Sequence, residues 1–346
     1  MYITNSACIS PQQTYNETFF EGEINVHHGD RFMAAEPNYG QLIPAGLLRR
    51  MGKAVRMGIG AGLPIIQGVD LGGIILGTAN GGLEDCLKFL NQIVDYNEGT
   101  LTPTNFVQST PNAVAGNLAL ISKTTGYNAT HVHRGLAFEC AVLDAMLLLR
   151  EQSPDAVLIG SVEEISDYNH NIDLLNGLFK AGEVSSENLF TLDTPGSVNG
   201  EGSTMFVAEP ERSERTLAEI KDVDQLTYAS KNELEERVGY ILERNGLTAA
   251  DVDTLILGIS GDNRTDHFYT GLQQALFPES RIYTFKNLVG DYPTASAFAT
   301  WMGVQALSGK EMPEQCKYAL SSRETKNVLI YNHYQGTQHG FILLGA

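Results

Sequence analysis

Short apolar runs along this chain alternate with longer segments in which apolar residues recur every three or four positions. The runs predict strands at residues 2–9, 72–76, 156–160, 205–208, 254–257 and 282–285. The periodic segments predict helices at about 83–96, 111–124, 231–245, 266–276 and 293–307, and the last two runs, 327–331 and 340–344, predict a closing hairpin. Strands that alternate with helices are typical of a mainly parallel sheet covered by helices.

Polar, turn-rich sequence predicts connections at 10–40, 167–202 and 218–232. A short internal echo links Ile75-Leu76-Gly77 to Ile256-Leu257-Gly258, since each ends a buried strand and precedes a polar turn and a helix. We therefore expect two similar α/β halves, 1–210 and 211–346, packed as one compact unit.

Residues 126–164 contain the most informative local pattern. It reads as a strand at 129–133, a tight turn at Arg134-Gly135, and an apolar helix to about Arg150. Many enzymes hold a nucleophile on a sharp strand-to-helix turn, where the helix N-terminus offers unpaired N–H groups and a positive dipole end. Here the residue on the turn is glycine, so the predicted site lacks a nucleophile.

Composition and charge narrow the class of protein. Of 346 residues, 42% are hydrophobic and 18% charged, which is ordinary for a globular protein, and no apolar run reaches the length of a membrane span. A formal charge of −18 argues against nucleic acid as a partner. The N-terminal residues show no signal-peptide pattern, and the four cysteines show no CxxC spacing, so we expect a reducing cytoplasm.

No cofactor or metal is expected. His131 and His133 would face the same side of a strand, but no third metal ligand can be placed, so we interpret them as interface or core histidines.

Six segments, in order, resemble the β-ketoacyl synthases of the thiolase-like superfamily. They lie at residues 3–11, 74–83, 104–117, 200–203, 286–290 and 336–337. The resemblance covers nearly the whole chain and implies an α/β, thiolase-like fold. In that fold two similar halves give a layered helix/sheet/helix/sheet/helix core.

The catalytic residues of the family can be carried over by position. The nucleophilic cysteine would lie nine residues after Gly126, at Gly135. The first histidine would fall within 258–262, which contains none, and the second falls on Asp291, whereas the lysine is retained as Lys286. Without a thiolate no thioester forms, and without imidazole donors the enolate is not stabilised, so no condensation is expected.

Chain-length factors are members of this kind: they lack the cysteine, pair with an active ketosynthase and shape its acyl tunnel. Short forms resemble those of aryl-polyene and flexirubin-type pigment clusters. The resemblance implies a ketosynthase partner (or a homodimer) and substrates on acyl carrier protein. It implies tunnel residues Phe106, Val114, Phe138 and Tyr334, for which core packing is the alternative.

A basic helical pattern is the predicted docking site for the acidic carrier protein. Arg49, Lys53 and Arg56, at i, i+4 and i+7, would share one helix face, with Arg50 beside them. A solvated helix face is the alternative interpretation.

Three further alternatives remain open. An acyltransferase could use Cys140 as a displaced nucleophile, or acid–base chemistry by His133 and Glu139. A homodimer could bind an acyl chain without any synthase. Gly135 could also be an ordinary turn glycine with a positive φ. At the vacated site, we expect Lys286 and Asp291 to form an ion pair.

Overall fold

The computed structural model describes residues 1–152 and 154–346, and in these residues one long mixed sheet organises the fold. Its eleven strands follow the order β11-β10-β9-β12-β13-β8-β1-β7-β5-β3-β4. The first portion contains β1 (Tyr2–Ile9), β3 (Gly73–Gly77), β4 (Tyr127–His131), β5 (Val157–Glu163) and β7 (Gly202–Glu209). The second contains β8 (Ala218–Thr227), β9 (Thr254–Leu257), β10 (Arg281–Thr284), β11 (Lys317–Ala319), β12 (Asn327–Tyr334) and β13 (Gln338–Gly345).

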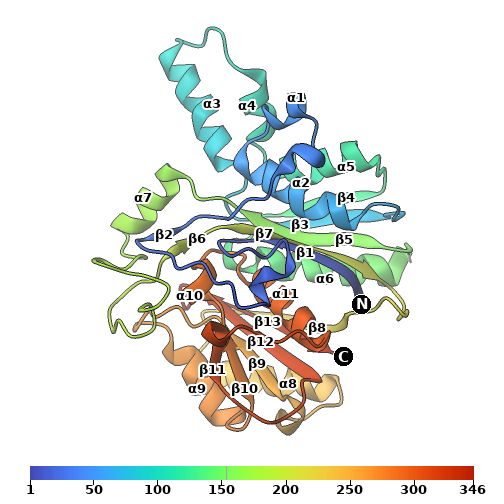
Figure 1. Cartoon of the computed structure of the whole chain (residues 1–346), viewed down its shortest axis with the longest axis vertical. Coiled ribbons are helices and arrows are strands. Elements are labelled where there is room, and N and C mark those ends of the chain that lie inside the picture. Colours follow the sequence, from blue (N-terminus) through green and yellow to red (C-terminus); the bar gives the residue numbers. More distant parts are fainter. Residues whose placement is uncertain (153) are drawn as a thin grey trace.

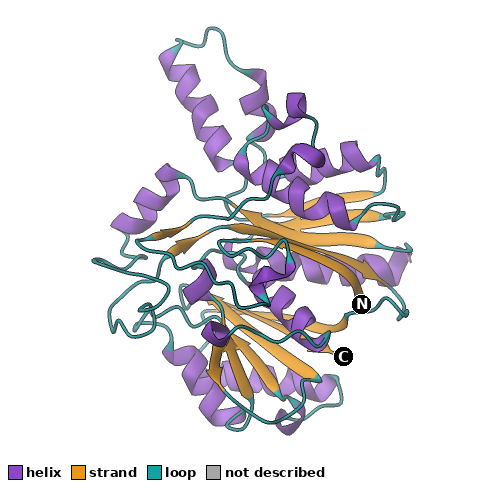
Figure 2. Ribbon diagram, viewed as in Figure 1, coloured by secondary structure: helices purple, strands orange, loops and turns teal. Residues whose placement is uncertain are grey.

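The sheet and helices form the predicted five layers (Figures 1 and 2). Helices α2 (Lys53–Ile65) and α5 (Ala113–Ser122) cover the first portion. Helices α6 (Ala137–Gln152) and α11 (Ser296–Leu307) lie between the two portions, and α8 (Lys231–Arg244) and α9 (His267–Leu276) cover the second. The thiolase-like expectation for the fold is therefore confirmed.

The remaining elements are short or lie outside these layers. An arm of α3 (Leu83–Asp95) and α4 (Pro103–Gln108) projects from the first portion in Figure 1. The others are α1 (Ala45–Leu48), α7 (Asp167–Leu175), α10 (Lys286–Val289), the paired strands β2 (Arg31–Phe32) and β6 (Asn199–Gly200), and 3-10 turns at Glu17–Phe19, Tyr39–Gln41, Arg134–Leu136, Ala249–Asp251 and Glu314–Cys316. In the described part of the chain, no helix is long and apolar enough to cross a bilayer.

The two portions of the sheet meet at a narrow junction. Strand β1 pairs with β8 only through Tyr2 with Glu219 and Ile3 with Ala218, and the N-terminal ammonium of Met1 donates to the carbonyl oxygen of Ile220 at 3.0 Å. The predicted division at residue 210 falls between β7 and β8 and stays a prediction.

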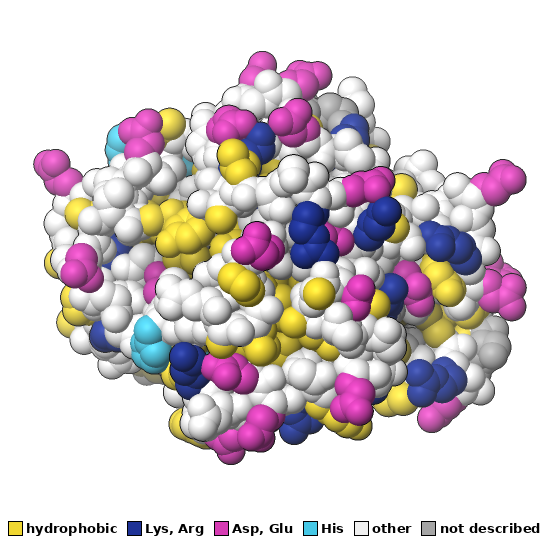
Figure 3. All heavy atoms as spheres, turned by 90° about the horizontal axis from the view of Figure 1, so that it is seen from below, with side chains coloured by type: hydrophobic (Ala, Val, Ile, Leu, Met, Phe, Trp, Pro, Cys, Tyr) yellow, Lys and Arg dark blue, Asp and Glu magenta, His cyan; other side chains and the backbone are white. Residues whose placement is uncertain are grey.

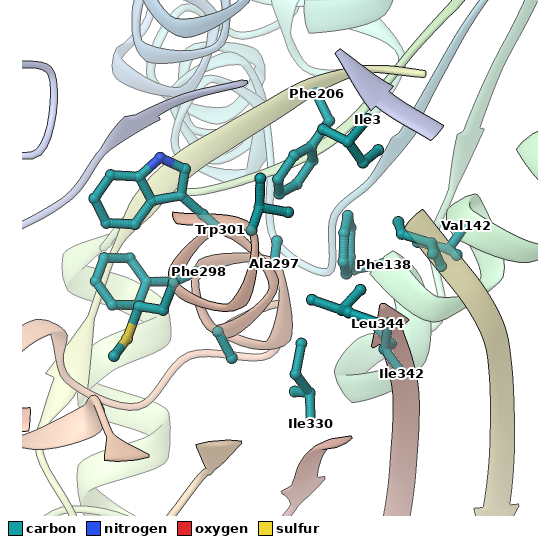
Figure 4. Packing of buried hydrophobic residues seen from close by; sticks show 14 of the residues in the cluster. Ile3, Phe138, Val142, Phe206, Ala297, Phe298, Trp301, Ile330, Ile342 and Leu344 are labelled. Atoms are coloured by element: carbon teal, nitrogen blue, oxygen red, sulfur yellow. The ribbon is translucent and has the colours of Figure 1, made fainter. Parts of the chain in front are cut away.

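The largest hydrophobic cluster fills the central layer. Figure 4 shows Phe138 and Val142 of α6 facing Ala297, Phe298 and Trp301 of α11, with residues of both sheet portions around them. These α6 and α11 side chains are at most 3% exposed. Burial of so much apolar surface is the main stabilising term here, and it fixes α6 and the turn that precedes it.

Several predicted elements were wrong. The basic helical pattern is broken, because α1 ends at Leu48 and α2 begins only at Lys53, after Gly52 with an extended backbone (ψ 166°). The predicted connection at 218–232 contains β8, and the one at 167–202 contains α7.

Candidate functional site

The turn before α6 requires glycine because another chain segment approaches it. The φ of Gly135 lies outside the left-handed region, whereas the preceding Arg134 has a φ of 48°. A Cβ on Gly135 would overlap Tyr334 Cβ and lie 2.8 Å from Tyr334 Cγ. The interpretation of Gly135 as a turn glycine with positive φ is therefore wrong. Tyr334 occupies the space that a nucleophilic side chain would need.

The backbone donors of this turn are already used. The Gly135 N–H donates to Gln338 Oε1 at 3.0 Å, and the Leu136 N–H donates to the His133 carbonyl oxygen at 3.1 Å. The Ala137 N–H donates to the Arg134 carbonyl oxygen. The expectation of unpaired N–H groups is therefore wrong, since 3-10 geometry and Gln338 satisfy them.

A cavity of about 330 Å³, which we call the inner cavity, lies beside Tyr334. Its wall is rich in carboxylates and includes one arginine and one histidine: Glu163, Glu164, Asp173, Asp262, Asp291, Arg264 and His333. Among the described residues, none that lines this cavity is a cysteine. The inner cavity thus lacks a thiol, and its wall is predominantly acidic.

Lys286 and Asp291 lie together at this cavity. Lys286 Nζ is 2.8 Å from Asp291 Oδ1, which is the predicted ion pair; the lysine side chain is fully buried and the aspartate is 27% exposed. Burial raises the pKa of Asp291, and the Lys286 ammonium opposes that rise.

His333 was not predicted from the sequence, because histidine was expected only at the family's motif positions. Burial, then the charge of Lys286, holds the pKa of His333 well below its ordinary value. Its Nδ1 accepts from the Gly336 N–H at 3.3 Å, and its Nε2 lies 3.3 Å from the Thr265 carbonyl oxygen, to which the neutral ring can donate. The ring also stacks on Tyr269 at 4.3 Å between centroids, so both nitrogens and one face are occupied.

Two fully buried carboxyls lie near the turn. Burial raises the pKa of Glu163 and of Glu139 to about 7. Glu163 accepts from the Ala79 and Asn80 N–H groups at 2.5 and 2.9 Å, whereas in the described part of the chain nothing donates to Glu139 Oε2. Glu163 is held in place by the backbone, whereas Glu139, on α6 just after the turn, is buried with one carboxyl oxygen that no described donor reaches.

The residues of the alternative enzyme lie outside the inner cavity. Cys140 Sγ lies 3.7 Å from Gln225 Oε1 on β8, and burial raises its thiol pKa, which disfavours the thiolate. Neither His133 nor Glu139 lines the cavity.

His131 Nε2 lies 2.7 Å from Asp144 Oδ2. No group of three or more His, Cys, Asp or Glu in the described residues could hold a metal ion.

The four predicted tunnel residues are not brought together. Tyr334 lines the inner cavity, whereas Phe138 and Val114 belong to two different hydrophobic clusters. Phe106 is 58% exposed on the arm and contacts Phe89 at 5.2 Å between ring centroids. A shared tunnel therefore stays a prediction for Tyr334 and has no geometric support within this chain for the others.

The four predicted docking cations do meet, although no single helix carries them. They line a second, more open cavity of about 600 Å³, which we call the outer cavity. Lys53 pairs with Glu201, and Arg56 donates twice to Glu36 at 2.7 Å. Arg49 and Arg50 make no ion pair with any described residue. By contrast, on the face seen in Figure 3, basic side chains lie among acidic ones.

The layer order, the strand order and the Gly135 turn together define a thiolase-like ketosynthase fold. Residues 29–185 match the sequence profile described as "Beta-ketoacyl synthase, N-terminal domain". Compared by sequence with curated proteins, the chain has no match.

Solved structures agree with this fold over the whole length of the chain. The ishigamide ketosynthase/chain length factor matches with a TM-score of 0.81 and 16% identity, covering 100% of this chain and 98% of that one. A β-ketoacyl synthase from Burkholderia phymatum matches with a TM-score of 0.80 and 15% identity, covering 99% of this chain and 98% of that one. A ketosynthase in complex with its chain length factor, from Xenorhabdus doucetiae, matches with a TM-score of 0.78 and 15% identity. The match covers 100% of this chain and 97% of that one.

Proposed function

We propose that this chain is a non-condensing, ketosynthase-like subunit, a chain-length factor, that pairs with an active β-ketoacyl synthase. It works in cytoplasmic type II fatty-acid-like or polyene biosynthesis, of the aryl-polyene or flexirubin type, and helps to shape the acyl tunnel. The observation that carries the proposal is the Gly135 turn, where a side chain on residue 135 would overlap Tyr334 Cβ.

In this proposal, the groups required for condensation are absent from the inner cavity or unsuitable there. A ketosynthase needs a thiolate to form the acyl thioester, and no thiol lines the inner cavity among the described residues. It also needs donors where negative charge develops on the enolate. Asp291 places a carboxylate there, and both nitrogens of His333 face backbone groups. A partner must therefore supply the chemistry.

An unpaired sheet edge supports the presence of a partner subunit. Strand β4 is the last strand of the first portion, so one edge of its backbone pairs with no described strand. Exposed apolar side chains lie on β4's neighbours in sequence and space: Leu120, Val132, Leu143 and Leu147. Proteins usually cover such an edge, because it pairs readily with other chains. We assign this surface to the ketosynthase partner.

The outer cavity supports docking of an acidic carrier protein. Arg49 and Arg50 have no carboxylate partner among the described residues, in a chain whose formal charge is −18. Two uncompensated cations against such a background are well placed to attract a negatively charged surface.

Co-expression with a ketosynthase that has an intact Cys-His-His set tests the pairing. We expect a mixed dimer by co-purification and size exclusion, and we expect Leu143→Glu/Leu147→Glu to abolish it. Tyr240→Glu, which changes an exposed apolar residue on α8, is the matched control. A chain that never forms a mixed dimer would contradict the proposal.

Intact mass spectrometry after incubation with acyl-carrier thioesters tests the enzyme alternative. A covalent acyl adduct on this chain would favour an acyltransferase. We expect the mass to stay unchanged, because Cys140, the cysteine that follows the turn on α6, faces Gln225.

A further inference from the structure

The β12–β13 hairpin meets the Gly135 turn with two side chains at once. Tyr334, the last residue of β12, and Gln338, the first of β13, are paired opposite each other across the hairpin. Tyr334 Cβ and Cγ occupy the space beside Gly135, and Gln338 Oε1 accepts its N–H at 3.0 Å. One supersecondary element therefore reaches both the side-chain position and the backbone donor of the turn.

The hairpin tip is fixed by a hydrogen bond within the hairpin and by another from the residue that follows β8. The Thr337 N–H donates to the Tyr334 carbonyl oxygen at 3.1 Å, and the Tyr228 N–H donates to the Thr337 carbonyl oxygen at 2.7 Å. Gln335 and Gly336 have φ values of 53° and 63°, so the tip has a tight, defined geometry. The position of Tyr334 Cβ is therefore set by the hairpin backbone, whereas the hydrogen bond from the Gly135 N–H depends on the Gln338 side chain.

We propose that Tyr334 and Gln338 form a built-in plug that excludes acyl thioesters from the vacated turn. A thioester bound for attack needs room at position 135 and a free N–H for its carbonyl oxygen. Tyr334 fills the room at position 135, and Gln338 occupies the N–H. This inference rests on the proposed function only in naming the acyl thioester as the excluded ligand; the plug itself is a property of the isolated chain.

The plug predicts that the turn cannot be repaired by one substitution. The overlap involves Tyr334 Cβ, so Tyr334→Ala would keep it and only Tyr334→Gly removes it. Loss of the cysteine and closure by the hairpin are therefore two separate barriers to acylation.

A double-substitution cycle on the full chain tests the steric part. Gly135→Ala should lower the melting temperature by about 5 °C, the scale expected for overpacking a buried site in a chain of this size. In a Tyr334→Gly background, the same substitution should cause little further loss. Tyr334→Phe, which keeps Cβ and the ring, is the matched control and should leave the full loss. Equal losses in all three backgrounds would overturn the plug.

Thiol labelling tests closure of the site directly. Gly135→Cys is compared with Gly135→Cys/Tyr334→Gly for alkylation by iodoacetamide, mapped by peptide mass spectrometry, with Cys140 as internal reference. We expect the double variant to react about tenfold faster, because a buried thiol reacts only when the structure opens. A single variant that fails to fold while the double variant folds supports the plug. Equal labelling, or a double variant that also fails to fold, counts against it. Neither test involves a partner, so failure of the mixed dimer leaves these results unchanged.

Discussion

The inner and outer cavities share a wall but differ in chemistry. Glu164 and Ile165 line both. The inner cavity has five carboxylates and one arginine in its wall. The outer cavity collects Arg31, Arg49, Arg50, Lys53, Arg56 and Lys88 against four carboxylates.

The two cavities therefore differ in the charged groups that they leave free. At the inner cavity the Gly135 turn is filled by Tyr334, and the charge of Lys286 is neutralised by Asp291. At the outer cavity two arginines stay without carboxylate partners among the described residues. Under the proposed function, the outer cavity would attract an acidic protein, and the turn beside the inner cavity would be closed to reaction. Three predictions sharpen this contrast.

The largest effect is expected from Asp291→Ala. It leaves the fully buried Lys286 ammonium without its ion-pair partner, and we expect the free energy of unfolding to fall by about 3 kcal/mol. Urea denaturation at neutral pH measures the change. Lys286→Met/Asp291→Ala, which removes both charges, should recover most of the loss. An unchanged unfolding midpoint for Asp291→Ala would show that the pair does not neutralise the site.

The next effect is the pH dependence of stability that the buried carboxyl of Glu139 causes. Burial raises the pKa of Glu139 from 4.5 to about 7, so the folded chain holds this proton more tightly than the unfolded chain. Its contribution is therefore fully present below pH 4.5 and is lost as pH rises through 7. Glu139→Gln should raise stability at pH 8 and flatten this part of the profile. Glu236→Gln, on the exposed face of α8, should leave the profile unchanged.

The smallest effect is expected at the outer cavity. Arg49→Glu/Arg50→Glu should weaken carrier-protein binding about tenfold at low salt, with less difference at high salt. Isothermal titration at two salt concentrations measures it. Arg212→Glu is the control. It makes the same kind of charge reversal on the loop after β7, away from the outer cavity, and should have little effect on binding. Equal weakening by Arg212→Glu would indicate general repulsion rather than a docking site.

Most of the fold could be predicted from local pattern. Strands 2–9 and 254–257 were predicted with their observed bounds. The second is fully buried and mostly apolar, which is the pattern typical of a central strand. Strand β8 was missed because several of its positions are charged, its pairing with β13 is irregular near Leu343, and its partner lies over a hundred residues later. The basic helix was predicted as continuous because its periodicity extends across Gly52, where the backbone is extended.

The candidate site could be predicted only in part. Motif counting placed Gly135, Lys286 and Asp291 around one site, and the ion pair follows from their charges. The approach of Tyr334 and the hydrogen bond from the Gly135 N–H to Gln338 could not be predicted, because they depend on how a hairpin about 200 residues away packs against the turn. The sequence predicts a turn without a nucleophile, and only the tertiary structure shows that Tyr334 lies against this turn.

The narrow pairing between β1 and β8 has a consequence for how the chain is made. A ribosome completes all five strands of the first portion before it reaches Ala218, so during synthesis β1 has one edge open to water. Helix α11, which closes the central layer, emerges later still. A truncated protein ending near residue 210 would therefore present both an unpaired strand and uncovered apolar side chains of α6, and we expect it to aggregate rather than fold alone.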